Sequence, residues 1–372
     1  MRRRHDRCGR SHRLSALGSP MTGVRPAAGT PVRGRIGRVW YLDEQSPQRL
    51  RQYVGSPAQV AGIDRFCEED GPARGARRFQ VRTGSGLVFD VLPDRGLDLG
   101  AASFRGVPLA WISPAGHVGP GHVEHEGTGW QRTFGGGLLT TCGLDQFGAP
   151  ATDEGQEFGL HGRASGLAAQ QVNTVADGRL EVTGRLRQTR LFGENIVLDR
   201  AITTELGSRA VTVTDTVTNE GFEPQPHMVL YHMNLGWPLL DSGSVLRVPG
   251  AEPVARDAEA ERGLGSWDTF TAPSPGFAEQ VFRHDFAEPG PAEARLLNPD
   301  LGLSLAIRFD TRRLPGLFQW KMLGAGTYVL GIEPANCRVI GGRAAARAAG
   351  ELPVLEPGES RSYAVEVEVA EA

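Results

Sequence analysis

Alternating hydrophobic and polar positions dominate the chain from residue 78 onward. Over residues 209–218, valine and threonine alternate, which is the pattern of a strand with one buried face. Long amphipathic helical patterns are scarce, and the alanine-rich stretch Arg343–Ala349 is too short to predict a helix. Similar runs separated by turn residues predict strands over Arg78–Thr83, Gly86–Leu92, Leu180–Gln188, Ile196–Leu206, Arg209–Thr218, Met228–Met233, Leu303–Phe309, Leu317–Met322, Tyr328–Glu333 and Tyr363–Val369. The sequence therefore predicts an all-β fold built as a large twisted β-sandwich.

Three long stretches lack this alternation, and we expect them to be functional loops. They are Ser113–Gly129, which is rich in Gly, Pro and His, the glycine-rich Phe134–Gly166, and the acidic Gly250–Glu279, which we expect to be a surface excursion. No stretch between them has the composition of a linker. Residues 36–372 are therefore predicted to form a single domain.

The first 35 residues are expected to lie outside that domain. Residues 1–20 contain six arginines and one aspartate, and no apolar segment follows them, so the pattern of a secretory signal is incomplete. We expect a disordered tail, or an over-extended start with true initiation at Met21. A nucleic-acid-binding arm is the open alternative.

Composition and charge narrow the classes of function. The 372-residue chain has a formal net charge of −3, which argues against general electrostatic binding of nucleic acid. No run of eighteen apolar residues predicts a transmembrane helix, and we expect no membrane partner. Four scattered cysteines match no metal-ligand spacing, so we expect reduced thiols and a cytoplasmic location. Arginines number 39 against the single lysine Lys321.

Three short segments could together carry acid/base chemistry. His161 lies in the loop segment 160–163, His232 lies near the end of a predicted strand, and Glu333 ends another strand just before a proline. Apolar neighbours make a buried carboxylate costly unless it is paired or functional. Each residue could also be structural: His232 as a satisfied core histidine, Glu333 as a solvated strand end, His161 as an ordinary loop residue. Together they form a candidate acid/base set near neutral pH.

At these residues the sequence resembles the galactose-mutarotase-like (aldose 1-epimerase) superfamily. The words LHGRAS at 160–165, YHMNLG at 231–236 and YVLGIEPANC at 328–337 are similar to that family's motifs and occur in the same order. The resemblance spans roughly residues 78–369 and implies the supersandwich fold. The segment 93–111 is similar to the opening strands of a branch whose substrates are poorly defined.

The resemblance also implies roles for individual residues. Glu333 would be the general base for the anomeric hydroxyl, His232 the general acid at the ring oxygen, and His161 a hydrogen-bonding group for the substrate. The partner would be a small-molecule sugar, with no cofactor and no metal, because only protons move. For an acid and a base on opposite edges of a sugar ring, we expect their functional atoms to lie within roughly 6–8 Å of each other.

Two departures from the family pattern concern the substrate. The usual Asn-Arg-Ile word is absent, with the glycine-rich segment 135–143 in its place, and the second motif is two residues shorter between its histidine and Asn-Leu. Arg95 is a candidate for sugar hydroxyls or an acidic group, or alternatively a turn charge paired with Asp94 or Asp98. Asn234, in the second motif, is also predicted to bind substrate.

The strand around Lys321 supplies further candidates. Alternation places Gln319 and Lys321 on one face and Trp320 on the other. Because sugar sites combine donors with an aromatic platform, we predict all three as substrate-binding residues and expect Gln319 and Lys321 to face the pocket. Trp320 as ordinary core is the alternative.

Two other functions stay open at this point. His117, His122 and His125 are the most metal-like cluster, although their spacing matches no zinc motif. A keto-sugar isomerase or lyase could use this loop or Lys321, and a non-catalytic carbohydrate-binding protein could use the same scaffold. The sequence defines neither the sugar nor an oligomeric state.

Overall fold

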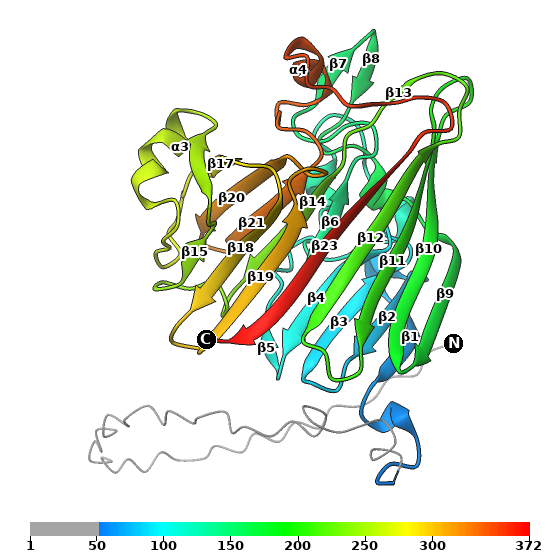
Figure 1. The fold of residues 1–372 in the computed structure, drawn as a ribbon, viewed down its shortest axis with the longest axis vertical. Coiled ribbons are helices and arrows are strands. Elements are labelled where there is room, and N and C mark those ends of the chain that lie inside the picture. Colours follow the sequence, from blue (N-terminus) through cyan, green and yellow to red (C-terminus); the bar gives the residue numbers. More distant parts are fainter. Residues whose placement is uncertain (1–51) are drawn as a thin grey trace, which may run out of the picture. The chain divides into compact units, whose positions relative to one another are not determined.

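The computed structural model describes residues 52–372, in which two large antiparallel sheets form the layers of a β-sandwich (Figure 1). The eleven-stranded sheet has the order β1 (Gly62–Cys67), β2 (Arg77–Arg82), β3 (Leu87–Leu92), β4 (Asp98–Phe104), β6 (Leu139–Cys142), β14 (Leu230–Gly236), β21 (Thr327–Ala335), β20 (Gly316–Gly324), β17 (Gln280–Phe286) and β16 (Ala251–Ala255), with β5 (Val107–Pro108) paired to β4. The eight-stranded sheet has the order β15 (Val245–Arg247), β18 (Pro291–Asn298), β19 (Leu303–Asp310), β23 (Ser360–Glu371), β12 (Ala210–Asn219), β11 (Asn195–Glu205), β10 (Arg179–Thr189) and β9 (Gln170–Asp177). The predicted all-β sandwich is therefore confirmed.

The remaining elements are short. Two small sheets pair β7 (Ala151–Asp153) with β8 (Gln156–Phe158) and β13 (Gln225–Pro226) with β22 (Val354–Leu355). The α-helices are α2 (Trp130–Thr133), α3 (Ala258–Gly263) and α4 (Arg343–Ala348), and the 3-10 helices are η1 (Pro57–Gln59), η2 (Gly71–Ala73), η3 (Pro120–His122), η4 (Ala164–Gly166) and η5 (Leu264–Ser266). No helix in residues 52–372 is long and apolar enough to cross a membrane.

The main core lies between the two large sheets. In β12, the residues that alternate with the threonines are buried, as the periodicity of the sequence predicts. Residues 1–35, with their expected tail and alternative start, lie outside the described part of the chain. The cysteines within it, Cys67, Cys142 and Cys337, are free thiols.

Two of the three predicted loops contain strands, which corrects the prediction for them. Phe134–Gly166 contains β6, a strand near the middle of the eleven-stranded sheet. All four residues of β6 are buried, so the strand shows no alternation of polar and apolar positions. Gly250–Glu279 contains the edge strand β16 and the helix α3, in which Asp257 accepts hydrogen bonds from the main-chain N–H groups of Glu259 and Ala260. The stretch at Arg343 forms the six-residue helix α4.

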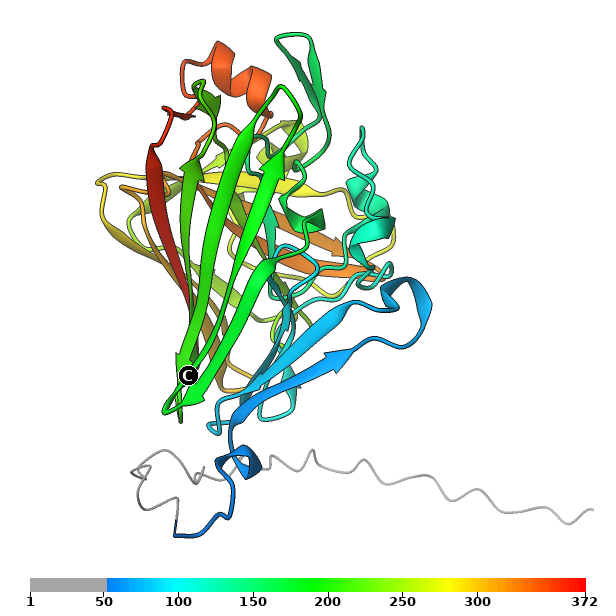
Figure 2. The ribbon, with the colours of Figure 1, turned by 90° about the vertical axis from the view of Figure 1, so that its right-hand side faces the viewer.

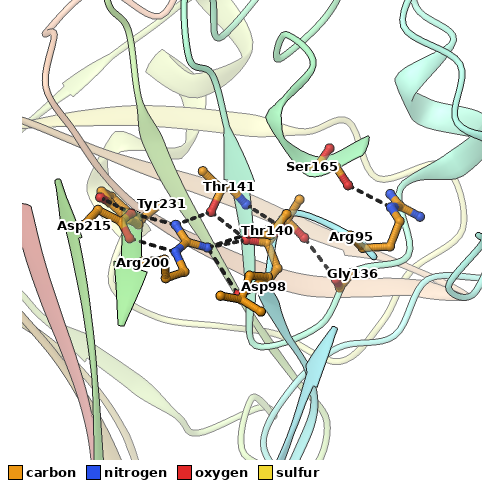
Figure 3. Close-up of polar contacts among 11 residues, drawn as sticks. Arg95, Asp98, Gly136, Thr140, Thr141, Ser165, Arg200, Asp215 and Tyr231 are labelled. Atoms are coloured by element: carbon orange, nitrogen blue, oxygen red, sulfur yellow. Dashed lines mark hydrogen bonds and ion pairs between the residues drawn. The ribbon is translucent and has the colours of Figure 1, made fainter. Parts of the chain in front are cut away.

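A buried ionic network joins the two sheets (Figure 3). The Arg200 guanidinium of β11 is fully buried and bonds to Asp215 of β12 at 2.7 Å and to Asp98 of β4 at 2.8 Å. It also donates to the Thr141 hydroxyl of β6, and Tyr231 of β14 donates to Asp215. The side chain of Tyr231 therefore points into the space between the sheets. Because neighbouring strand residues point to opposite faces, His232 points to the outer face of the eleven-stranded sheet.

Candidate functional site

The site is centred on two adjacent strands of the eleven-stranded sheet. On the outer face, the Nε2 of His232 on β14 lies 3.3 Å from Oε1 of Glu333 on β21, and both side chains are almost completely buried. Gly331 lies beneath this pair. A Cβ atom there would come within 2.6 Å of Glu333 Oε1 and 2.9 Å of Trp320 Cβ, so the pair needs glycine at this position.

His161 is brought to the same place by the segment between β8 and η4. Its φ of 59° is in the left-handed region, and its ring centroid lies 5.6 Å from that of His232. The Gly148 N–H donates to His161 Nδ1 at 3.4 Å. Because that nitrogen accepts a hydrogen bond, the neutral imidazole carries its proton on Nε2 and can donate there.

Aromatic rings surround the imidazoles. Trp130 of α2 stacks on Phe134 and lies 4.6 Å from the His161 ring, and Phe134 and Trp320 lie 5.3 and 5.6 Å from the His232 ring. Such a wall suits the apolar faces of a sugar ring and lowers the local dielectric response.

Burial sets the protonation of the three groups. It raises the pKa of Glu333 to about 8, and nearby Glu279 raises it further while Arg256 acts in the opposite direction. It lowers the pKa of His161 to about 4. Burial, reinforced by His161, also holds the pKa of His232 well below its usual range. At neutral pH the His232–Glu333 pair is therefore uncharged and carries one ionisable proton, on Glu333.

At 3.3 Å, the contact between His232 and Glu333 lies within the expected limit of roughly 6–8 Å, but it leaves no space for a sugar ring between the two groups. The two side chains face each other directly from neighbouring strands, so a sugar ring between them requires one side chain to change rotamer. The structure brings the three predicted catalytic residues together.

Among the predicted substrate-binding residues, Arg95 and Asn234 are held by main-chain oxygens. Arg95 is buried and donates to the carbonyl oxygens of Ser165, Val118 and Thr133 (Figure 3 shows the first), and it forms no hydrogen bond or ion pair with Asp94 or Asp98. Its guanidinium therefore links three segments beside the site, those that contain Val118, Thr133 and Ser165. Asn234 is fully buried, and its amide donates to the carbonyl oxygens of Gly137 and His232.

The expected orientation of Gln319 and Lys321 is wrong. Gln319 bonds to His284 and to the Trp267 carbonyl, and the Lys321 Nζ donates to the Ser266 carbonyl at 2.6 Å. Both side chains therefore point away from the face of β20 that carries Trp320, because β20 continues its alternation without a bulge. Trp320 alone of these three contacts His232.

Several further residues of the site were not predicted from the sequence. Glu279 accepts from Trp320 Nε1 at 2.9 Å and from Arg256 at 3.0 Å, so the segment expected to be a surface excursion reaches the site. Thr140 of β6 lies directly opposite His232. Trp111, whose ring lies 6.3 Å from that of Trp320, ends the segment 93–111 that resembles the superfamily. Trp130 and Phe134 border the predicted loops or begin them, and their glycine-rich surroundings were the signal of a function.

The histidine-rich loop is arranged differently from a metal site. The Nε2 of His117 and the Nδ1 of His125 are buried without hydrogen-bond partners in the described structure. Within residues 52–372, no three His, Cys, Asp or Glu side chains gather in an arrangement that could hold a metal ion.

Comparison with known proteins agrees with this fold. A family model described as a domain of unknown function (DUF4432) matches residues 73–369. The chain is similar to a candidate aldose 1-epimerase from Klebsiella pneumoniae, with 26% identity and a TM-score of 0.78 over 82% of this chain and 83% of that one. It is also similar to the galactose 1-epimerase from Lactobacillus acidophilus, with 13% identity and a TM-score of 0.56 over 84% and 99% of the two chains. No curated protein matches the chain. The predicted likeness to the galactose-mutarotase-like (aldose 1-epimerase) superfamily is confirmed.

Proposed function

Because the chain belongs to the DUF4432 family and has the fold of aldose 1-epimerases, we propose that it is a carbohydrate-active isomerase that interconverts the anomers of a small sugar. The observation that carries this proposal is the buried contact of 3.3 Å between His232 and Glu333, with His161 beside it. Ring opening and reclosure require an acid and a base in one site, and this aromatic-lined site contains both.

The reaction needs two proton transfers. Glu333 accepts the proton of the anomeric hydroxyl, and His232 gives a proton to the ring oxygen, which opens the ring. Rotation about the C1–C2 bond and reversal of both transfers produce the other anomer. His161, which can donate from Nε2, hydrogen-bonds the substrate on its ring-oxygen side. Trp320 provides a platform for the apolar face of the ring.

Before substrate binds, the shared proton of the His232–Glu333 pair lies on Glu333, whereas the mechanism needs it on His232. Burial favours protonated Glu333 with neutral His232, whereas this mechanism starts from ionised Glu333 with protonated His232. The two forms contain the same number of protons and differ only in where the proton lies. The reactive form is therefore reached by proton transfer across the existing contact.

A keto-sugar isomerase or lyase that uses Lys321 receives less support, because Lys321 binds the Ser266 carbonyl away from Glu333. A direct test is exchange between anomers, measured by NMR with purified protein over a panel of aldoses and keto sugars. Exchange faster than buffer alone is expected for at least one sugar. Saturable binding with no exchange for any sugar would instead favour the carbohydrate-binding alternative.

The pH dependence of kcat/KM should reflect the ionisation of the His232–Glu333 pair. Because the active pair holds one proton, activity is expected to be nearly constant between about pH 6.5 and 7.5. It should fall about tenfold per unit above about pH 8, where Glu333 loses that proton. Measurements are corrected for base-catalysed exchange in buffer. A rate that rises through about pH 8 would contradict a proton shared by the pair.

The charged residues beside Glu333 should shift this profile in opposite directions. Glu279→Gln removes a negative charge but keeps an acceptor for Trp320, so the alkaline limb of kcat/KM is expected to move down by about 0.3–1 pH unit. Arg256→Gln should move the alkaline limb up by a similar amount, and the double variant should largely cancel the shifts. Shifts in the same direction would contradict an electrostatic effect on Glu333.

A further inference from the structure

A cavity whose lining includes neither His232 nor Glu333 lies on the outer face of the eleven-stranded sheet. It has a volume of about 330 Å³ and is bounded by the turn between β1 and β2, the outer face of β3 and β4, and residues 112–118. Figure 2 shows the β1–β2 hairpin (blue) on the same side of the molecule as the segment that contains α2. The Gly119 N–H donates to the Pro72 carbonyl at 2.8 Å and ties the hairpin turn to the loop.

The polar part of the cavity pairs a guanidinium with carboxylates. Arg78 donates to Glu68 at 2.6 Å and lies 3.4 Å from Asp90. Asp90 is largely buried, and burial raises the pKa of its carboxyl group. Guanidinium donors next to carboxylate acceptors complement neighbouring hydroxyl groups, which both donate and accept.

The charged groups of the lining balance, and most of the remaining wall is apolar. Three arginines (Arg77, Arg78 and Arg95) stand against three carboxylates (Glu68, Asp90 and Asp94). The apolar wall is supplied by Ala73, Ala76, Leu92, Ala101, Ile112 and Val118, with the imidazole of His117 beside them. Ile112 is 43% exposed although it is large and hydrophobic. A balanced polar wall beside apolar groups favours a neutral ligand that has hydroxyl groups and C–H faces.

The cavity continues along the sheet. A neighbouring groove of about 220 Å³ shares Asp90, Ala101 and Ile112 with it and adds Gln80 and Ser103. Amide and hydroxyl groups extend the same mixture of donors and acceptors over β2, β3 and β4.

We propose that this cavity is a second binding site, which takes a neutral saccharide unit separately from the site at His232 and Glu333. The proposal goes beyond the proposed function and does not require that reaction. Ile112 supplies the contact for the C–H face of the sugar, and Asp90 with Arg78 supplies the contacts for its hydroxyl groups.

Methyl glycosides of neutral hexoses test this site, because they lack the free anomeric hydroxyl that the proposed reaction needs. Titration of the isotope-labelled protein is followed by NMR. Saturable shifts of the Ala101, Ile112 and His117 amide resonances are expected for neutral glycosides, and weaker shifts for a uronic acid or an amino sugar. The proposal would be overturned if these amide resonances did not shift with up to about 100 mM glycoside, a concentration far above the Kd expected for a specific binding site.

Two variants separate this site from the catalytic one. Asp90→Asn should weaken glycoside binding about tenfold or more, and Ala101→Leu should fill the cavity from an exposed position and abolish binding. Asp199→Asn, on the other sheet, serves as the matched control and should bind normally. Anomer exchange should persist in the Asp90 and Ala101 variants. Unchanged binding in both would overturn the site even if the enzyme is active.

Discussion

Replacing Glu333 with glutamine should reduce kcat/KM for anomer exchange by about 10²–10⁴, because glutamine can neither take up nor release the proton that the reaction moves. The side chain keeps its size at a position where the residue is 3% exposed. The variant is therefore expected to fold. NMR exchange spectroscopy or polarimetry measures the loss.

The same variant should be more stable than the parent protein near neutral pH. Burial raises the pKa of Glu333 from 4.5 to about 8, so the unfolded state ionises first and folding loses stability as the pH rises between these values. Glutamine removes this cost, a gain of up to about 3 kcal/mol near pH 7 that disappears near pH 4. Glu366→Gln, on the surface of β23, is the control and should leave activity unchanged. Full activity in Glu333→Gln would refute the catalytic assignment.

Replacing Arg200 with leucine should destabilise the protein by about 3–5 kcal/mol, because Asp98 and Asp215 would lose the cation that compensates them between the sheets. The side chains of Arg200 and Asp215 are completely buried, so water cannot replace the lost partner. The free energy of unfolding in urea, obtained by linear extrapolation, measures the effect.

Arg185→Leu provides the matched comparison. Arg185 makes a two-point ion pair with Asp199 on the same sheet, but both side chains are partly exposed to water. Its loss should cost only about 0–1 kcal/mol. Equal losses in the two variants would show that burial does not control the strength of these ion pairs.

The strands and the central chemistry could largely be predicted from the sequence. The valines of β12 alternate because one face of the strand packs between the sheets, and His161, His232 and Glu333 stand in words whose order matches the superfamily. The structure places these three residues together.

The parts that could not be predicted depend on packing between distant segments. β6 has buried residues on both faces, so no alternation identified it. Glu279 reaches Trp320 only through the fold of the 250–279 segment. Gln319 and Lys321 point to the side of β20 on which Trp267 and Ser266 lie. Alternation shows that the two side chains share a face, but it does not specify which face lines the site.

The adjacent positions of Tyr231 and His232 limit which substitutions the protein can accept. Tyr231 contacts the interior ionic network on one side of the sheet, and the next residue, His232, places its imidazole in the candidate site on the other side. Substitutions that shift the interior would therefore also displace the imidazole. Trp130 and Glu279 lie outside β14, so substitutions there would alter the walls of the candidate site without changing a residue of that strand.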